Sequence, residues 1–327
     1  MLTIVIPTYN RRESLRKGLE ALIPQVERHK DQVSLYISDN CSDDGTAEVV
    51  GGFQARYPDL IGYKRQSSNL GAQGNFRDAV LSVDSKYVVL FSDDDVALPF
   101  FMDTVMEQLH KHPDVAMVNY NALTVSEEGE FRGVRDSISY GGAPKLYNTG
   151  SEFIKEHTHV PSLVSSNIFL REGFIREADK ISIGDYPGYD WYAALMKSIV
   201  SKACVYLDVP LFLANSPSCQ RWERNAPWYY VVGLSRLFKE LDASNPGIWS
   251  SWKGVFHSTW FENYCLNCIA RYQNEYRERY VALIEWSPSE EFSRKLKYYL
   301  FHSARYRHIM LGVLPKVARS LSLNFLK

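Results

Sequence analysis

The chain has 327 residues, of which 45% are hydrophobic and 23% are charged, a composition typical of globular rather than disordered or fibrous proteins. Its formal net charge of -1 provides no overall basic surface, so we expect no nucleic-acid partner. No apolar run reaches the ~20 residues that a membrane span needs, and residues 1–9 lack the features of a signal peptide. We therefore expect a protein that is cytoplasmic or peripheral on the inner face of the cytoplasmic membrane.

Five cysteines are scattered along the chain. An odd number without a secretion signal favours reduced thiols. Cys265 and Cys268 form a lone CxxC pair, with no second pair and no histidine nearby at ligand spacing. Because structural metal sites generally use four ligands, we expect both to be buried cysteines of a helix.

The N-terminal half alternates short β-rich runs with helical patterns, as repeated βαβ units do. In chain order, the patterns predict a strand at 2–7, a helix at 13–25, a strand at 33–38, a helix at 46–56, a strand at 61–65, a helix at 74–83 and a strand at 87–91. Right-handed crossovers place the carboxyl ends of such strands along one edge of the sheet. The sequence therefore predicts an α/β fold with a mostly parallel central sheet flanked by helices.

The pattern loosens after Pro99. It predicts a helix at 100–111, a strand at 115–120, a glycine-rich stretch at 129–150, and helices at 151–157 and 189–200. From about residue 225 onward, the sequence predicts few strands and instead predicts helical segments that are rich in aromatic residues. Five of the seven tryptophans lie between residues 222 and 260, which indicates a packed helical subdomain or, alternatively, a ligand-binding surface. We predict a main domain at 1–225 and a helical subdomain at 226–327.

Three polar clusters follow predicted strands. They are Pro7-Thr8-Tyr9-Asn10, the stretch from Ser38 to Thr46, and Ser92-Asp93-Asp94-Asp95. One such cluster alone is also typical of a turn or a helix N-cap. Three in succession at strand ends favour ligand-binding loops.

The three consecutive aspartates of the last cluster are the most informative about the chemistry of the site. Three like charges directly after a buried strand are costly unless a cation or a donor-rich ligand neutralises them. Carboxylates suit Mg²⁺ or Mn²⁺, which share their remaining coordination sites with water and substrate phosphates. The cluster thus indicates a divalent cation and a phosphorylated substrate, with an acidic start to the following helix as the alternative.

These motifs resemble a known family. Residues 5–11, residues 38–46, Asn69-Leu70-Gly71 with Asn75, and residues 91–95 are similar, in this order, to the signature of family 2 glycosyltransferases with a GT-A fold, as found in bacterial O-antigen and capsule synthesis. The similarity is close over residues 1–100 and loose over 100–225. It implies a Rossmann-like GT-A fold with a mainly helical C-terminal extension, a nucleotide diphosphate sugar donor, a saccharide acceptor and Mn²⁺ or Mg²⁺.

The resemblance also implies roles for individual residues. Thr8 and its neighbours would line the nucleobase pocket, Asp39 would accept a hydrogen bond from the base, and Asp93 would contact the ribose. Asp94 or Asp95 would ligate the metal, while Ser92 stands where many relatives carry an acid. The full set implied to bind the donor is Pro7, Thr8, Tyr9, Asn10, Arg11, Asp39, Asn40, Asn69, Gly71, Asn75, Asp93, Arg221 and Trp222.

Glycosyl transfer needs a general base for the acceptor hydroxyl. In the family this is an acid well beyond the triple-aspartate position, at the start of a helix, and Gly188-Tyr189-Asp190-Trp191 resembles that element. We expect Asp190 to be the base, with Asp185 as the alternative; Asp190 could also merely cap its helix. Direct displacement with one base predicts inversion at the anomeric carbon.

Two C-terminal features remain open. Gln220-Arg221-Trp222 partly resembles a motif of processive family members, which would place Arg221 and Trp222 beside the diphosphate or the acceptor, unless they are packed on the surface. Residues 292–327 contain eight Lys or Arg, no Asp or Glu, and interleaved apolar residues. One interpretation is that this segment lies on an anionic membrane, where it would meet a lipid-linked acceptor. The alternative is that it packs on the protein as a helix with a solvated basic face.

Other functions fit the motifs less well. Neither GxGxxG nor GxxxxGK[ST] occurs, which argues against a dehydrogenase, a P-loop protein, and sugar-nucleotide modifying or nucleotidyl-transferring enzymes. We expect an inverting, metal-dependent glycosyltransferase of surface polysaccharide synthesis. A non-catalytic nucleotide- or carbohydrate-binding module of the same fold is the alternative, and the oligomeric state is left open.

Overall fold

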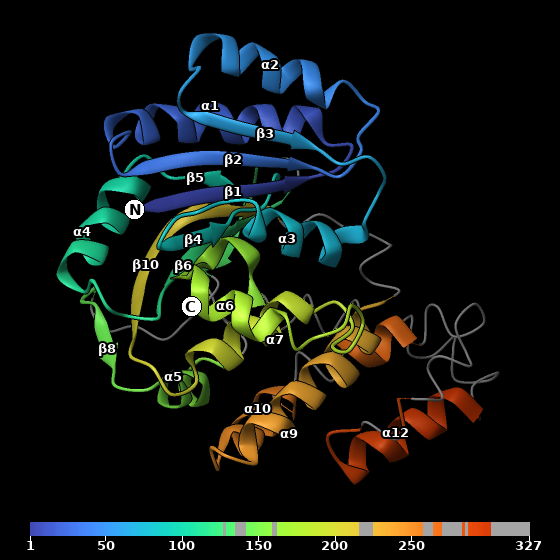
Figure 1. The fold of residues 1–327 in the computed structure, drawn as a ribbon. Coiled ribbons are helices and arrows are strands. Elements are labelled where there is room, and N and C mark those ends of the chain that lie inside the picture. Colours follow the sequence, from blue (N-terminus) through green and yellow to red (C-terminus); the bar gives the residue numbers. More distant parts are fainter. Residues whose placement is uncertain are drawn as a thin grey trace.

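The computed structural model describes residues 1–126, 129–134, 142–158, 162–215, 225–257, 264–269, 283–284 and 287–301. Its centre is a ten-stranded mixed sheet with helices on both faces (Figure 1). The predicted α/β class is therefore confirmed.

The N-terminal half of the sheet is parallel. Its strands are β1 (Leu2–Thr8), β2 (Val33–Asp39), β3 (Ile61–Arg65) and β4 (Tyr87–Leu90), in the order β3-β2-β1-β4. All four are predicted from the sequence to within two residues. Their carboxyl ends meet at one edge because each crossover returns the chain in the same direction.

The other half of the sheet contains strands that the sequence did not predict. The short β9 (Asn167–Leu170) is antiparallel to both β4 and β6 (Met117–Val125). The long β10 (Cys204–Asn215) runs parallel to β6, with register shifts on either side of Pro210, and these irregularities explain why its pattern is hard to recognise. Short strands complete the sheet: β5 (Val96–Ala97), β7 (Phe131–Val134) and β8 (Lys145–Tyr147).

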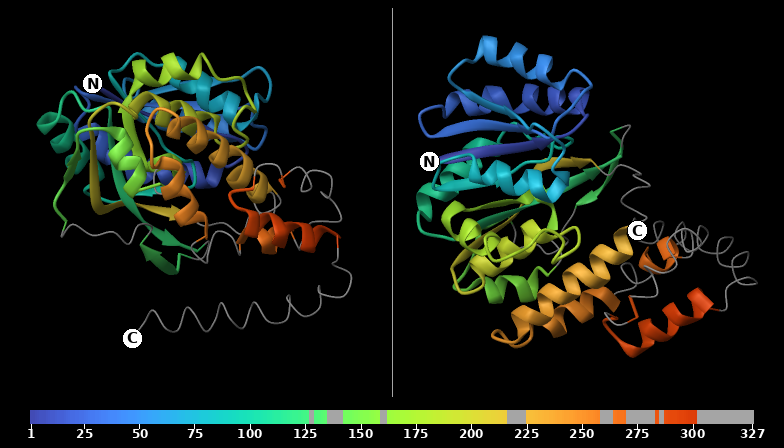
Figure 2. Two further views of the ribbon diagram at one scale, coloured as in Figure 1. Left: turned by 90° about the horizontal axis from the view of Figure 1, so that it is seen from below. Right: turned by 45° about the vertical axis from the view of Figure 1, so that its right-hand side comes forward.

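Helices cover the two faces and form two hydrophobic cores. On β1, Ile4 and Ile6 face the first core together with Leu15 and Leu19, whereas Val5 faces the second, as the twofold alternation of a strand requires. The first face carries α1 (Arg12–Arg28), α2 (Thr46–Arg56) and α4 (Phe101–Lys111). The second carries α3 (Gly71–Leu81), α5 (Gly150–Glu156), α6 (Arg171–Ala178) and α7 (Asp190–Ile199) (Figure 2).

The described C-terminal residues are mainly helical, as predicted. They form a π-helical segment at Trp228–Leu234, then α9 (Ser235–Asp242), α10 (Ile248–His257), a helical segment at 264–269, and α12 (Glu290–Phe301). Cys265 and Cys268 are buried in the segment 264–269, which confirms their prediction. In the part of the chain that is described, no helix combines the length and apolar character needed to cross a membrane.

These C-terminal helices share the second core with α7. Trp252 is fully buried between Phe238 and Phe256, and its indole N–H donates to Ser235 Oγ at 3.1 Å. Trp228 and Trp249 also pack against this core, which supports the packed-subdomain interpretation for them, while Trp222 and Trp260 lie outside the described residues. The boundary at residue 225 stays a prediction, as does membrane contact through 292–327, of which only 292–301 are described.

Candidate active site

The first and third polar clusters meet at the carboxyl ends of β1 and β4. Thr8 Oγ1 donates to Asp93 Oδ2 at 2.7 Å. The Arg11 guanidinium contacts two carboxylates through one nitrogen: Nη1 lies 3.0 Å from Asp93 Oδ1 and 2.7 Å from Asp94 Oδ2. A single cationic group therefore contacts two of the three acids that the sequence places after the strand and partly offsets their charge.

Asp93 is a buried carboxylate whose charge is disfavoured by its surroundings. Burial raises the pKa of Asp93 to about 6, and the nearby Asp94 charge adds to this. The Arg11 charge and the hydrogen bond from Thr8 oppose the shift. At neutral pH the carboxylate is ionised and can accept further hydrogen bonds.

Asp94 and Asp95, which the sequence could not distinguish, have different surroundings. The Asp94 side chain is 16% exposed and accepts a bond of 2.5 Å from Ser92 Oγ. Asp95 is buried, and its Oδ2 accepts a 2.6 Å bond from Ser165 Oγ. Ser165 Oγ also accepts from the Ser92 backbone N–H at 2.8 Å. Asp95 and Ser165 thus fasten the acidic loop to the interior, while Asp94 is partly exposed.

The second cluster is joined to the first by loop-to-loop hydrogen bonds. Asn10, whose φ is 51°, donates its backbone N–H to Ser42 Oγ at 2.9 Å and accepts from the Asp43 N–H at 2.9 Å. Asp44 Oδ2 accepts from the Arg12 N–H at 2.9 Å and so satisfies an open amide of the first turn of α1. These bonds hold the loops after β1 and β2 in one cluster.

The residues implied to shape the nucleobase and ribose side lie next to this cluster. Asp39 is fully buried and accepts bonds of 2.8 Å from the Ser42 N–H and from the Tyr63 hydroxyl. Asn40 Nδ2 donates to Asn69 Oδ1 at 2.9 Å, which draws the loop before α3 towards β2.

The remaining predicted residues differ in their environment. Asn69 Oδ1 also accepts from the Gly71 N–H at 2.8 Å, which helps α3 to begin three residues before its predicted start. Pro7 is buried within β1, and Tyr9 is 42% exposed. Arg221 and Trp222 lie outside the described residues.

Helix α3 connects the carboxyl end of β2 with the turn that contains Asp190. On one side, the Asn75 amide exchanges two hydrogen bonds with Ser38, of 2.7 and 3.0 Å. On the other side, the Gln73 amide donates to the Gly188 carbonyl at 3.1 Å and accepts from the Trp191 N–H at 3.2 Å. Gln73 and Ser165 are not predicted from the sequence, because neither belongs to a recognisable motif.

Asp190 is the first residue of α7 and is held by the turn that precedes it. Its two oxygens each accept a 2.8 Å bond, from the backbone N–H groups of Gly184 and Tyr186, so the side chain does not cap α7. Burial raises the pKa of Asp190, and these backbone bonds oppose the shift. The alternative base, Asp185, is more exposed and accepts from the Ser182 N–H.

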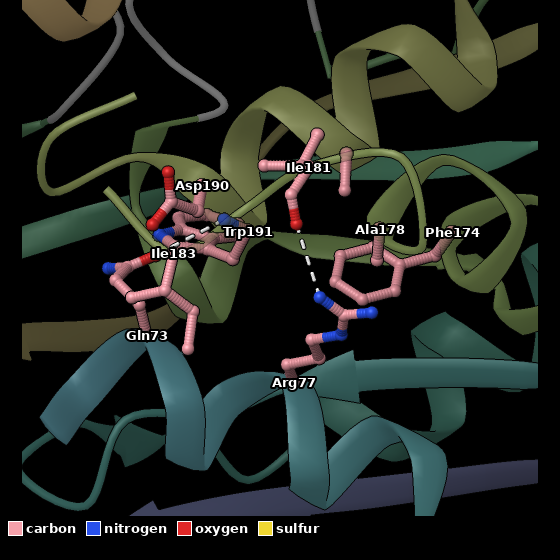
Figure 3. A pocket seen from close by; sticks show the side chains of 9 residues that line it. Gln73, Arg77, Phe174, Ala178, Ile181, Ile183, Asp190 and Trp191 are labelled. Carbon is pink, nitrogen blue, oxygen red and sulfur yellow. Dashed lines mark hydrogen bonds between the residues drawn. The ribbon is translucent and has the colours of Figure 1, made fainter. Parts of the chain in front are cut away.

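A small pocket between α3, α6 and α7 lies beside Asp190 (Figure 3). Its lining is mostly apolar and consists of Gln73, Arg77, Phe174, Ala178, Ile181, Ile183, Asp190, Trp191 and Ala194. An apolar lining fits the raised pKa of the carboxyl, because it disfavours the charged form.

Comparisons with curated proteins show similarity over the N-terminal part of the chain. Abequosyltransferase RfbV of Salmonella typhimurium is 32% identical over 115 residues, which are 35% of this chain and 34% of RfbV. Glycosyltransferase GlyA of Streptococcus pneumoniae is 22% identical over 216 residues, 64% of this chain and 30% of GlyA. The chain spans about a third of the length of these relatives.

Solved structures share the fold over nearly the whole chain. S. aureus TarS 1–349 superposes with a TM-score of 0.64 at 15% identity, covering 95% of this chain and 91% of that chain. The mannosyltransferase PcManGT of Pyrobaculum calidifontis, in complex with GDP-Man and Mn²⁺, has a TM-score of 0.54 at 15% identity, covering 94% and 86%.

The family comparison covers more than half of the chain. The sequence profile of Glycosyl transferase family 2 matches residues 3–175, a range that includes all three polar clusters and the strands that position them. The chain therefore belongs to glycosyl transferase family 2.

Proposed function

We propose that the protein is an inverting glycosyltransferase that moves one sugar from a nucleotide diphosphate sugar to a saccharide hydroxyl, in the synthesis of a surface polysaccharide. The observation that carries the proposal is the group of Thr8, Arg11, Asp93 and Asp94 at the carboxyl ends of β1 and β4. Family membership and similarity to an abequosyltransferase support it. So do fold neighbours in complex with UDP, UDP-GlcNAc and GDP-Man.

The donor would bind across the three joined loops that follow β1, β2 and β4, which we call the donor loops. Asp93 is ionised at neutral pH and would accept a hydrogen bond from a ribose hydroxyl beside Thr8, while Asp39 and Asn40 would border the base. The Arg11 guanidinium offers the planar donors that suit a diphosphate. We propose this orientation because it places the negatively charged diphosphate of the donor beside the positively charged Arg11.

The acidic cluster fits a divalent cation. Mg²⁺ or Mn²⁺ needs one or two carboxylates and takes substrate phosphates and water as further ligands, so the described residues need not supply a cluster of three or more acidic, His or Cys ligands, and they supply none. The cluster already holds a positive group, the Arg11 guanidinium, on Asp93 and Asp94. We propose Asp94 as the ligand rather than the interior Asp95. When bound, the ion would neutralise the charge of the leaving diphosphate.

We propose Asp190 as the general base. The two backbone bonds fix the direction of its carboxylate, and its raised pKa makes it a better proton acceptor than an ordinary aspartate. It would remove the acceptor proton as the hydroxyl attacks the anomeric carbon. A single displacement of this kind inverts that carbon.

The test is release of nucleoside diphosphate from a panel of nucleotide sugars with candidate saccharide acceptors, with Mn²⁺, Mg²⁺ or EDTA. We expect release from one donor that requires the ion, falls at least about a hundredfold in Asp94→Asn and Asp190→Asn, and is retained in the control Asp84→Asn, whose side chain is fully exposed. Proton coupling constants of the product should show the inverted configuration. Nucleotide binding without turnover of any donor would instead support a binding module.

A further inference from the structure

We infer that Arg11 acts as a built-in counter-ion that keeps Asp94 closed to free divalent cations, so that the metal ion is admitted only together with the diphosphate of the donor. This inference rests on the proposed function and adds an order of binding to it. It concerns the role of the guanidinium towards the metal before Arg11 contacts the diphosphate.

The first step of the argument is the occupancy of Asp94. Its Oδ1 accepts from Ser92 Oγ at 2.5 Å, and its Oδ2 lies 2.7 Å from Arg11 Nη1. Both oxygens are therefore engaged within the protein. A cation that approaches Asp94 has to displace the guanidinium from Oδ2, because the two positive groups cannot share that position.

The second step concerns Asp93, which the same Arg11 nitrogen contacts at 3.0 Å. Asp93 is 6% exposed, and an ionised carboxylate that loses its counter-ion in such a place is costly. If Arg11 leaves, Asp93 keeps its bond from Thr8 but loses its neutralising charge. When a lone metal ion displaces Arg11, Asp94 therefore gains a new counter-ion but Asp93 loses its own. The net gain in binding free energy is small.

The third step is the effect of the donor. A diphosphate brings negative charge and oxygens arranged for bidentate contact with a guanidinium. The Arg11 side chain is 43% exposed, so it can turn towards such a ligand. Once Arg11 pairs with the diphosphate, Asp94 is open to the metal ion, which then finds both a carboxylate and phosphate oxygens. Binding of each ligand favours binding of the other.

Arg16 provides a matched control. It lies on α1, the helix that Arg11 precedes, its side chain is similarly exposed at 42%, and it pairs with Glu13 and Glu20 of that helix. Removal of Arg16 leaves Asp93 and Asp94 unchanged. Any effect that depends on general surface charge would appear in both arginine variants.

The experiment is a titration of the apo protein with MnCl₂ alone, in which the electron paramagnetic resonance signal of unbound Mn²⁺ is followed. We expect the affinity of Arg11→Ala and of Arg11→Gln for Mn²⁺ to be higher than that of wild type by about tenfold or more. Arg16→Ala should bind Mn²⁺ as wild type does. The gain should disappear in Arg11→Ala/Asp94→Asn, and circular dichroism should show that each variant is folded. With UDP or GDP added, we expect the Mn²⁺ affinity of the wild type to rise more than that of Arg11→Ala.

Two outcomes would overturn the inference, and they are distinguishable. If wild type binds Mn²⁺ in the presence of a nucleoside diphosphate, but Arg11→Ala gains no affinity for Mn²⁺ alone, the counter-ion role is wrong and the proposed function stands. If no variant binds Mn²⁺ with or without nucleoside diphosphate, the metal dependence of the proposed function falls together with the inference.

Discussion

Asp93 shows how a single residue at the site combines a functional charge with a cost in stability. Its carboxylate is buried, and its pKa is raised to about 6 from an unfolded value near 4. Above pH 6 the carboxylate is charged in both states, and its burial lowers the free energy of unfolding. As the pH falls through 6 the folded protein binds the proton first, so this penalty disappears by about pH 4.

Asp93→Asn should therefore stabilise the protein at pH 8, by up to about 3 kcal/mol because one pKa unit corresponds to ~1.4 kcal/mol. The advantage over wild type should shrink at pH 5, while donor binding is weakened at both pH values. Thermal unfolding at the two pH values checks this, with Asp84→Asn as the exposed control. A melting temperature below that of wild type at pH 8 would contradict the argument.

At the scale of elements, α3 joins the donor loops to the turn that presents Asp190. Asn75 fixes the helix to Ser38 at the end of β2, and two residues earlier Gln73 holds the turn at Gly188 and Trp191. A helix is stiff over such a short distance, so the donor loops and the proposed base keep a constant distance and orientation relative to each other. We therefore propose Gln73 as a positioning residue, which would act on the reaction through Asp190.

Gln73→Ala should lower kcat about ten- to a hundredfold, because a shift of 1 Å in a catalytic group costs this much. The Kd for the nucleoside diphosphate should change little, since the donor loops stay joined through Asn75. Gln73→Glu should recover part of kcat, because it keeps the acceptor for the Trp191 N–H. Gln54→Ala serves as the control; this glutamine bonds the Ile61 carbonyl on the other face of the sheet. Equal losses in kcat and in nucleotide affinity for Gln73→Ala would refute a positioning role.

At the scale of the whole molecule, the C-terminal helices support the turn before α7. Arg236 of α9 donates to the Asp185 carbonyl at 2.7 Å. Glu240 of the same helix accepts from the Tyr186 hydroxyl and, at 2.8 Å, from Lys197 of α7. One hydrophobic core contains residues of α7, α9 and α10. We therefore expect residues 226–257 to unfold together with the α/β part.

Trp252→Ala should lower the free energy of unfolding by about 3–5 kcal/mol, since it removes a fully buried aromatic side chain. Thermal unfolding should remain a single transition, and hydrogen exchange of the α7 amides should become faster. Trp249→Ala on the same helix should cost much less, because that ring is only partly buried. A separate C-terminal transition with unchanged protection of α7 would show two independent domains and support the boundary at residue 225.

The sequence by itself determined the alternation of strands and helices up to β4 and the positions of the three polar clusters. These features depend on local periodicity and on the constant hand of βαβ crossovers, so they can be read without knowing distant contacts. The family signature lies in the same segment, for the same reason. The sequence also located Asp190 at the start of a helix.

Only the tertiary structure decided how these parts face one another. It placed β9 antiparallel in the sheet, turned Asp95 inward to Ser165, left Asp94 partly exposed beside Arg11, and brought Gln73 to Trp191. The last two contacts join residues 70 and 118 positions apart. Such pairs are selected by packing and by the need to satisfy buried polar groups, and neither requirement leaves a periodic trace in the sequence.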